Sequence, residues 1–177
     1  MRILDTKFKG LKIVKGIKYR DNRGYFRETF KNNFFKKKKF VFWSMSMSKK
    51  NVIRGLHIQT KNPQGKYLSV LKGKIFDVSL DLRKDSKTFG KHFTTIISEN
   101  NSKSIFIPKG FAHGFCTLEK ENYIMYSNSN YRHKRSEIGI KYNDKKLKIK
   151  WPIKKPIISK KDSKNISFSE FKQKFYK

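Results

Sequence analysis

The residue types best suited to acid–base chemistry meet in one short stretch, Arg54-Gly-Leu-His57-Ile-Gln59. Histidine is scarce, with four among 177 residues, and His57 has apolar neighbours rather than lysines. A histidine exchanges a proton near neutral pH, whereas an arginine keeps a fixed positive charge. The pair is therefore suited to binding an anion and moving a proton beside it.

The length of the chain suits one well-buried domain, and we expect residues 1–177 to form a single domain. The N-terminal stretch is polar, and no apolar run is long enough to cross a bilayer. The single cysteine, Cys116, allows no intrachain disulfide, which is typical of proteins in a reducing compartment. These features predict a soluble cytoplasmic protein with no membrane partner.

The net charge suggests a different class of function, the binding of polyanions. Lys and Arg number 44 against 13 Asp and Glu, which gives a formal net charge of +31. Such an excess would suit a non-catalytic protein that binds polyanions. However, only eight of these cations are arginine, and the lysines are scattered through every segment. We interpret them as a coding bias at solvent-facing positions and expect no specific nucleic-acid partner.

Short alternating segments separated by turn residues indicate an all-β fold. The clearest strand covers residues 75–83, where Phe76, Val78 and Leu80 alternate with polar residues. We expect it to form a hairpin with residues 66–71 across Lys72-Gly73. Further strands are expected on both sides of a turn at 21–24, with the second at 25–30, and at 40–48 (half-buried), 93–98, 104–108, 111–118 and 123–127, with a basic connector at 34–39.

This succession of short strands, with a turn about every 8–12 residues, predicts an antiparallel barrel or jelly roll. Only the tail has a helical pattern, with Phe168, Phe171 and Phe175 at spacings of three and four. We expect this stripe to dock as a cap on the barrel.

Seven stretches, in order and in matching spacing, resemble segments of the dTDP-4-dehydrorhamnose 3,5-epimerase family. The resemblance runs from about residue 3 to 162, which defines the core and leaves 163–177 as a C-terminal cap or tail. The stretches are Asp21-Asn-Arg-Gly-Tyr-Phe-Arg-Glu28, Arg54-Gly-Leu-His57-Ile-Gln59, Gln64-Gly-Lys66, Phe76-Asp-Val-Ser-Leu-Asp-Leu-Arg83, Ile107-Pro-Lys-Gly-Phe-Ala-His113-Gly-Phe115, Trp151-Pro152 and Ser159-Lys-Lys-Asp162.

The resemblance implies a cupin jelly-roll barrel with short C-terminal helical segments, a homodimer, no metal and no cofactor. The implied substrate is dTDP-4-keto-6-deoxy-D-glucose, a dTDP-linked 4-keto-6-deoxy sugar. Its epimerisation at C3 and C5 gives dTDP-4-keto-L-rhamnose, on the route to dTDP-L-rhamnose and surface polysaccharide.

The same resemblance implies roles for eight residues. His57 matches the catalytic base and Asp162 its carboxylate partner, while Tyr126 matches the acid on the opposite face of the sugar. The family's remaining site residues lie near the ketone oxygen or bind the nucleotide sugar. Lys66 and His113 match the first group, and Arg23, Glu28 and Arg54 match the second.

The spacing of Arg54 and His57 conflicts with a shared pocket. On an ideal strand, residues 54 and 57 face opposite sides of the sheet. We therefore expect Gly55 to mark a bulge, unless the arginine reaches around a strand edge or has another role.

Two departures from the family leave the substrate open. Phe42, Trp43, Ser44 and Met45 stand where the family usually has Gln-Asp-Asn-His, and Arg132 replaces a tyrosine found in many members. One alternative is therefore an enzyme that epimerises one carbon only, or a related 4-keto-6-deoxy nucleotide sugar. A metal-dependent cupin is disfavoured, because metal cupins usually offer His-x-His and this chain has His57-Ile-Gln59.

Overall fold

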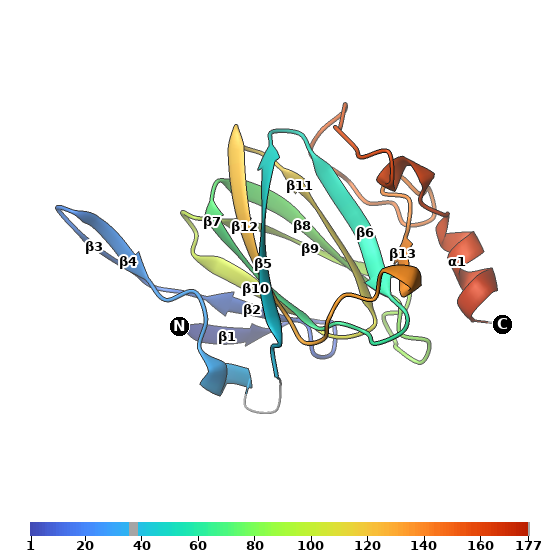
Figure 1. Cartoon of the computed structure of the whole chain (residues 1–177), viewed down its shortest axis with the longest axis horizontal. Coiled ribbons are helices and arrows are strands. Elements are labelled where there is room, and N and C mark those ends of the chain that lie inside the picture. Colours follow the sequence, from blue (N-terminus) through green and yellow to red (C-terminus); the bar gives the residue numbers. More distant parts are fainter. Residues whose placement is uncertain (36–38, 177) are drawn as a thin grey trace.

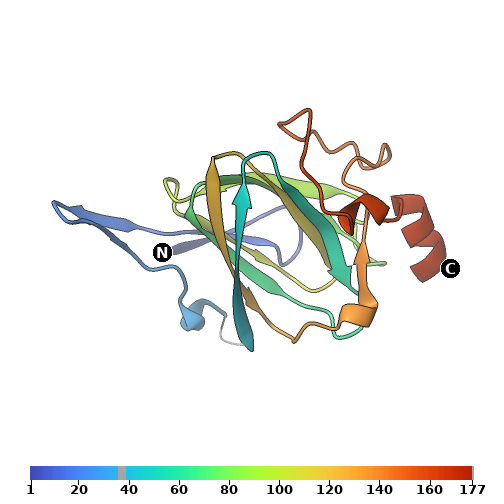
Figure 2. The same cartoon turned by 45° about the horizontal axis from the view of Figure 1, so that its top comes forward.

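Two antiparallel β-sheets packed face to face form the body of the molecule (Figures 1 and 2). The computed structural model describes residues 1–35 and 39–176. One sheet has the order β1 (Arg2–Asp5), β2 (Lys12–Lys15), β10 (Lys103–Ile107), β7 (Lys66–Lys72), β12 (Glu121–Asn128), β5 (Phe42–Lys49). The other has the order β13 (Glu137–Gly139), β6 (Ile53–Gln59), β11 (Phe111–Thr117), β8 (Lys74–Asp81), β9 (His92–Ser98). This arrangement confirms the expected antiparallel jelly-roll barrel.

Aliphatic side chains from both sheets fill the space between them. Leu68, Val70 and Ile124 of the first sheet share one fully buried cluster with Ile75 and Ile97 of the second. Burying each such side chain contributes about 1.5–3 kcal/mol relative to leaving it in water. This cluster holds the two sheets together.

The alternation of β8 is confirmed, but its apolar face lies outside the barrel. Val78 and Leu80 belong to a second cluster, which includes Phe171 of the C-terminal helix. Asp77 and Ser79 lie on the opposite, inner face and are also fully buried. The second sheet is therefore covered on both faces, with polar groups directed inward.

The C-terminal segment provides the outer cover of that sheet. Helix α1 (Phe168–Phe175) begins at a capping box formed by Ser167 and Glu170 and packs Phe171 against the sheet. The expected helical cap is thus confirmed. None of the helices in the described residues has the length and hydropathy needed to cross a bilayer.

Strand β5 also directs its apolar side chains outward. The strand was expected to be half-buried, yet Trp43, Met45 and Met47 are exposed by 56%, 60% and 45%. The serines between them lie on the inner face, where Ser46 and Ser48 form hydrogen bonds with residues of the barrel interior. β5 is the edge strand of its sheet. The exposures of Trp43, Met45 and Met47 mean that nothing in the described residues covers these side chains.

The predicted hairpin between residues 66–71 and 75–83 is wrong. β7 pairs with β10 and β12, whereas β8 pairs with β9 and β11 in the other sheet. The chain does turn sharply at Gly73, where φ is +88° and a side chain would collide with the carbonyl oxygen of Glu121. A tight-turn signal shows where the chain reverses, but not whether the strands remain in one sheet.

Other boundaries differ from expectation as well. β13 was not expected, because residues 123–127 were taken to hold the last marked strand. The turn at 21–24 is confirmed, but the strand after it ends at Arg27 rather than Phe30. The expected connector at 34–39 begins in a 3-10 turn at Asn32–Phe35, and residues 36–38 lie outside the described part.

The turn at 21–24 joins a small two-stranded hairpin of β3 (Lys18–Asp21) and β4 (Gly24–Arg27). This hairpin projects from the end of the molecule opposite α1 (Figure 1). Its aromatic side chains are largely exposed, with Tyr19 at 56% and Phe26 at 66%.

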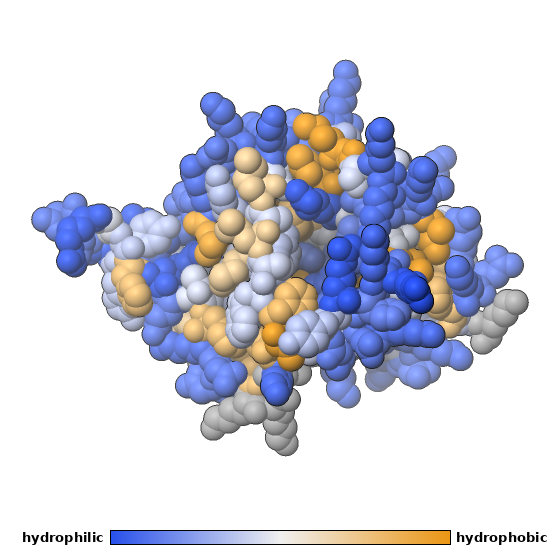
Figure 3. Space-filling model, viewed as in Figure 1, coloured by the Kyte–Doolittle hydropathy of each residue, from blue (hydrophilic) through white to orange (hydrophobic). Residues whose placement is uncertain are grey.

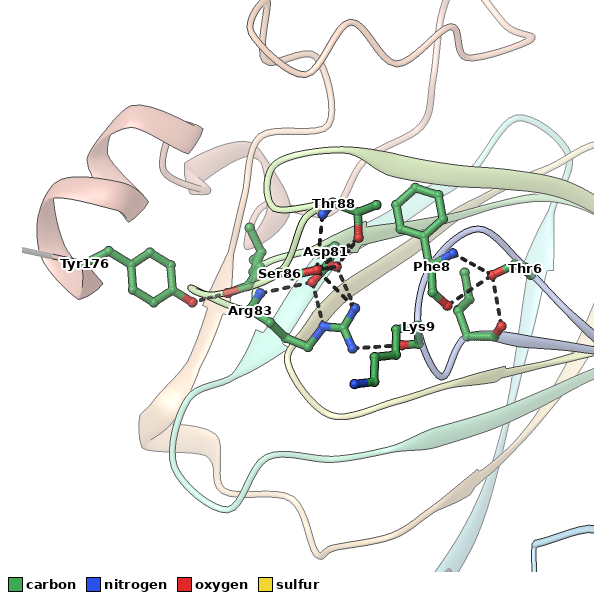
Figure 4. Close-up of polar contacts among 10 residues, drawn as sticks. Thr6, Phe8, Lys9, Asp81, Arg83, Ser86, Thr88 and Tyr176 are labelled. Atoms are coloured by element: carbon green, nitrogen blue, oxygen red, sulfur yellow. Dashed lines mark hydrogen bonds and ion pairs between the residues drawn. The ribbon is translucent and has the colours of Figure 1, made fainter.

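Asp81 organises the loop that follows β8 (Figure 4). Its fully buried carboxylate accepts two hydrogen bonds from the Arg83 guanidinium, at 2.8 and 2.7 Å. The hydroxyls of Ser86 and Thr88 donate to the same carboxylate at 2.6 Å each. The Tyr176 hydroxyl donates to the Leu82 carbonyl, which ties the end of α1 to this loop.

We predict that Asp81→Ala lowers the free energy of unfolding by about 3–5 kcal/mol. The substitution leaves the partly buried donors of Arg83, Ser86 and Thr88 without their shared acceptor. Urea denaturation at pH 7 measures the change.

Asp5→Ala is the matched control, because it breaks an exposed ion pair with Lys12 and should change little. Burial acts to raise the pKa of Asp81, but the bonds from Arg83, Ser86 and Thr88 outweigh it and lower the pKa. The stabilisation is thus present above the ordinary carboxyl pKa and lost as pH falls through the lowered value. A destabilisation as small as that of the control, or one that persists in acid, would contradict the prediction.

Candidate active site

A cavity of about 700 Å³ opens into the barrel and is lined by strands of both sheets and by the segment before α1. Such a volume suits a small-molecule site. Six of the eight residues predicted from the sequence line it: Arg54, His57, Lys66, His113, Tyr126 and Asp162. The other two, Arg23 and Glu28, do not.

His57 and Asp162 form a close pair in this cavity. The distance from His57 Nε2 to Asp162 Oδ1 is 2.6 Å, and the aspartate side chain is only 6% exposed. Burial acts to raise the pKa of Asp162, but the hydrogen bond and charge of His57 and bonds from Gly55 and Ser159 outweigh it and lower the pKa. An ionised carboxylate only accepts hydrogen bonds, so Nε2 must donate. The neutral imidazole then carries its lone pair on Nδ1, so that nitrogen is the one able to accept a proton.

A bulge at Gly55 brings Arg54 and His57 to the same cavity. His57 lies opposite His113 and Arg54 opposite Phe115, so β6 has one residue more than β11 between these pairs. Gly55 has φ +102°, and a Cβ at this position would lie 2.5 Å from the His113 carbonyl oxygen. The expected bulge is therefore present, and it requires glycine.

The Arg54 guanidinium is held at the cavity mouth by β5. Its Nε donates to the Ser48 hydroxyl at 2.9 Å, and Nη2 donates to the Met47 carbonyl at 3.1 Å. The side chain is otherwise open to solvent, so its remaining N–H groups are available to an anionic ligand.

Two further side chains with nitrogen donors face the interior from opposite sheets. Lys66 lies on β7, where burial lowers its pKa and the negative charges of Glu137 and Asp77 partly counter that effect. His113 lies on β11 and is 5% exposed, with Nε2 2.6 Å from Asp77 Oδ2. Sequence reasoning missed Asp77 as a site residue, although it did place this aspartate on the polar face of its strand.

Tyr126 reaches the cavity from the wall opposite His57, because β12 and β6 belong to different sheets. Its hydroxyl lies 2.9 Å from the Ser46 hydroxyl. Burial raises the pKa of Tyr126 to about 12. The phenol therefore remains protonated at neutral pH and is available as a proton donor.

Arg23 and Glu28 lie away from the cavity of their own chain. Arg23 is at the tip of the β3–β4 hairpin, with its side chain 85% exposed and paired with Asp21 at 2.6 Å. Glu28 follows β4 and pairs with Lys31 at 2.8 Å. The structure thus does not bring these two residues together with the other six.

The cavity also contains charges that the sequence did not reveal as a group. Glu137 lies between Arg132 and Lys161, and burial acts to raise its pKa. The hydrogen bonds from these two cations outweigh burial and lower the pKa to about 2. Arg132 was noted only as a departure from the family, and Glu137 lies on the unexpected strand β13. Within residues 1–35 and 39–176, no cluster of three or more His, Cys, Asp or Glu is arranged to hold a metal ion.

Comparison with known proteins agrees with this geometry. The sequence model of the dTDP-4-dehydrorhamnose 3,5-epimerase family matches residues 5–170. The dTDP-4-dehydrorhamnose 3,5-epimerase of Shigella flexneri is 39% identical over 168 residues, covering 92% of this chain and 93% of the relative. The enzyme of the same name from Neisseria gonorrhoeae is 40% identical, although this chain spans only 51% of its length.

A solved structure of similar shape comes from Legionella pneumophila. It is a dTDP-6-deoxy-D-glucose-3,5-epimerase in complex with dTDP-4-keto-L-rhamnose. Its TM-score is 0.90 at 39% identity, and the match covers 94% of this chain and 92% of that one. On the strength of its sequence, its fold and its cavity, the chain belongs to the dTDP-4-dehydrorhamnose 3,5-epimerase family of isomerases.

Proposed function

We propose that this chain epimerises dTDP-4-keto-6-deoxy-D-glucose at C3 and C5 and gives dTDP-4-keto-L-rhamnose for dTDP-L-rhamnose and surface polysaccharide synthesis. The observation that carries the proposal is the placement of the His57–Asp162 pair and Tyr126 on opposite walls of one cavity. We also treat residues 1–177 as one catalytic domain, with 163–177 as its cap.

The chemistry begins with a C–H bond next to the C4 ketone. Nδ1 of His57 takes the proton, the bonding electrons move to form an enolate, and the resulting imidazolium is stabilised by Asp162. Lys66 and His113 provide positive charge or hydrogen bonds for the enolate oxygen. Both C3 and C5 flank the ketone, so the same groups serve each carbon in turn.

Inversion requires that the proton return from the other face. Tyr126 donates its phenolic proton to the enolate carbon opposite His57, and the ketone forms again. The phenolate then regains a proton from solvent while the imidazolium loses one, which restores the starting enzyme. The raised pKa of Tyr126 keeps the donor protonated before each cycle.

The nucleotide part of the substrate would lie towards the cavity mouth. Arg54 is fixed there with free N–H groups that suit a diphosphate. At the other end of β5 from these contacts, Phe42 stacks on Tyr131 with ring centroids 5.9 Å apart and an interplanar angle of 8°.

The alternative function, epimerisation at a single carbon or of a related sugar, is favoured by one observation. Of the four residues that depart from the family on β5, Phe42 and Ser44 line the cavity. Trp43 and Met45 instead point outward into solvent. Phe42 and Ser44 are therefore the two substitutions that could change which sugar nucleotide or which carbon is accepted, whereas Trp43 and Met45 could not act in this way.

Proton NMR in D2O tests the proposed reaction and its base. The wild-type enzyme should incorporate deuterium at both C3 and C5, whereas His57→Ala should slow both exchanges by at least about 100-fold because the base is lost. Deuterium at one carbon alone would establish the alternative.

His92→Ala is the matched control, because His92 is half-buried on β9 and does not line the cavity. It should keep the wild-type rate. If His57→Ala also kept that rate, His57 would not be the base.

Removal of the Tyr126 hydroxyl should separate exchange from inversion. In Tyr126→Phe we predict that His57 continues to exchange protons on its own face, while net epimerisation falls by about 100-fold. Product configuration and deuterium content are both read by NMR. Tyr123→Phe, on the same strand but outside the cavity, is the control. Equal loss of exchange and inversion in Tyr126→Phe would contradict the opposite-face role.

We further propose that the chain acts as a homodimer in which the β3–β4 hairpin reaches the partner's cavity. Arg23 and Glu28 resemble sugar-nucleotide contacts, yet their hairpin projects away from the cavity of its own chain (Figure 1). Placing the hairpin against a second copy would reconcile these observations. Its exposed Tyr19 and Phe26 are suited to such a contact.

The outer face of β5 offers a second contact region for this dimer. Figure 3 shows pale and orange atoms gathered along β5 near the middle of the view, beside strongly hydrophilic surface. The exposed side chains of that strand are Trp43, Met45 and Met47. Clustered exposed apolar residues are typical of protein–protein contacts.

Complementation tests the shared site. Arg23→Ala should raise KM by about tenfold, since one charge-assisted contact is lost. When the Arg23→Ala chain is co-expressed with the His57→Ala chain, the purified heterodimer should regain about half of wild-type activity, because one of its two sites is intact.

The control pairs Arg23→Ala with the double variant Arg23→Ala/His57→Ala. No site in that heterodimer has both residues, so activity at low substrate should remain low. If the single variants also fail to complement each other, Arg23 does not act across the dimer.

A further inference from the structure

Glu137 joins two cations at the wall of the cavity. Arg132 donates to its carboxylate from Nε to Oε2 at 2.9 Å and from Nη2 to Oε1 at 3.2 Å, and Lys161 also donates to Oε1. The Glu137 side chain is 14% exposed, whereas those of Arg132 and Lys161 are 56% and 55% exposed. We call these three residues the Glu137 clasp.

The clasp connects three segments that are remote in sequence. Arg132 lies in the segment after β12, and Glu137 lies on β13, which pairs with β6 so that Gly139 is opposite His57. Lys161 immediately precedes Asp162, the first residue of a short 3-10 turn (Asp162–Lys164). The ion pair between Glu137 and Lys161 thus fastens the start of that turn to the sheet that carries His57.

The far end of the same turn has a separate attachment. Asn165 donates to the Gly55 carbonyl at 3.3 Å. Asp162 itself accepts from the Gly55 N–H at 3.4 Å, which is a long contact. The position of Asp162 relative to His57 therefore depends on ties at both ends of the turn. The clasp is one tie before its start, and the backbone bonds of Ile157 to Asn51 and Ile53 are another.

The clasp also places a negative charge near two site residues. Glu137 is ionised at neutral pH, because its two cations lower its pKa to about 2 despite burial. The charge of His57 contributes to that lowering, and Glu137 in turn raises the pKa of Lys66. A carboxylate in this place favours the positive charge of Lys66.

We propose that Glu137 is a positioning residue for proton transfer at His57: it fixes the turn that presents Asp162, and its carboxylate lies in the same cavity as His57 and Lys66. The catalytic half of this proposal rests on the proposed function, whereas the structural half does not. Arg132, one of the departures from the family, neutralises the exposed side of the carboxylate.

Hydrogen exchange tests the structural half without substrate. In Glu137→Gln, backbone amides of residues 158–166 should exchange about tenfold faster, because loss of the ion pair lowers the free energy of local opening. Lys161→Gln should have the same effect, since it cuts the same tie. Arg132→Gln should not, because it leaves the tie between Glu137 and Lys161 in place.

Glu119→Gln is the matched control. Glu119 also pairs with a lysine, Lys74, at 2.8 Å, but it lies outside the cavity. Unchanged exchange over residues 158–166 in both Glu137→Gln and Lys161→Gln would overturn the proposal. Should Glu137→Gln fail to fold, Lys161→Gln carries the test alone.

Kinetics test the catalytic half. Glu137→Gln and Lys161→Gln should lower kcat by about 10- to 100-fold with a smaller change in KM, because a misplaced Asp162 affects proton transfer more than binding. Wild-type kcat in both variants would overturn the catalytic half. If the wild-type enzyme itself produced no exchange at C3 or C5, the proposed function would fail, while hydrogen exchange would still decide the structural half.

The pH profile separates positioning from general damage. A protonated Lys66 is needed at the enolate, so activity should fall as Lys66 loses its proton. Glu137→Gln should move this basic limb to lower pH, since Glu137 raises the pKa of Lys66. Arg132→Gln should move it to higher pH, since Arg132 lowers that pKa. Shifts of the basic limb in the same direction in both variants would contradict the proposed effect of the Glu137 charge.

The other titratable or charged groups facing Lys66 are Asp77 and, in the same cavity, Arg54, His57, His113, Tyr126, Lys161 and Asp162.

Discussion

Asp77, His113 and Asp162 have lost nearly all contact with water at the cavity end of the barrel, and each needs a partner there. An unpaired buried charge would destabilise the fold by several kcal/mol. His57 is paired with Asp162 and His113 with Asp77, at 2.6 Å each, while Tyr126 lies beside Ser46. These pairs satisfy the buried groups and hold titratable side chains at the cavity.

This polar interior accounts for the reversed faces of β5 and β8. An inner face that supplies Asp77 to His113, and Ser46 to Tyr126, leaves most apolar residues of the same strand on the outside. For β8, the C-terminal segment with Phe171 covers that outer face. The helix therefore stabilises the strand that holds Asp77, although it makes no contribution to the cavity wall itself. For β5, the proposed second copy of the chain would cover the outer face in the same way.

The motif-bearing residues were predictable because their chemistry is tied to local sequence. Arg54, His57, Lys66, His113, Tyr126 and Asp162 all line one cavity, as their resemblance to the family suggested. Alternation also revealed β8. It could not reveal which face pointed inward, because a period of two is the same for a strand with a polar interior and one with an apolar interior.

The parts that could not be predicted depend on tertiary pairing. The Lys72-Gly73 turn gave no sign that β7 and β8 enter different sheets. Strand β13 is only three residues long and carries no alternation, so Glu137 had no visible partner in the sequence. The conflict between Arg54 and His57 did point to its own solution, since a bulge at Gly55 was one of the ways to put both on one cavity.

The alternation of β5 also separates two kinds of evolutionary change. Its even-numbered positions, from Phe42 to Ser48, face the interior, while Trp43, Met45 and Met47 face outward. Point substitutions can therefore alter ligand selectivity without touching the outer surface, or the reverse. Insertion or deletion of one residue would exchange the two sets along the affected length. We expect relatives to vary in residue type along this strand far more readily than in its length.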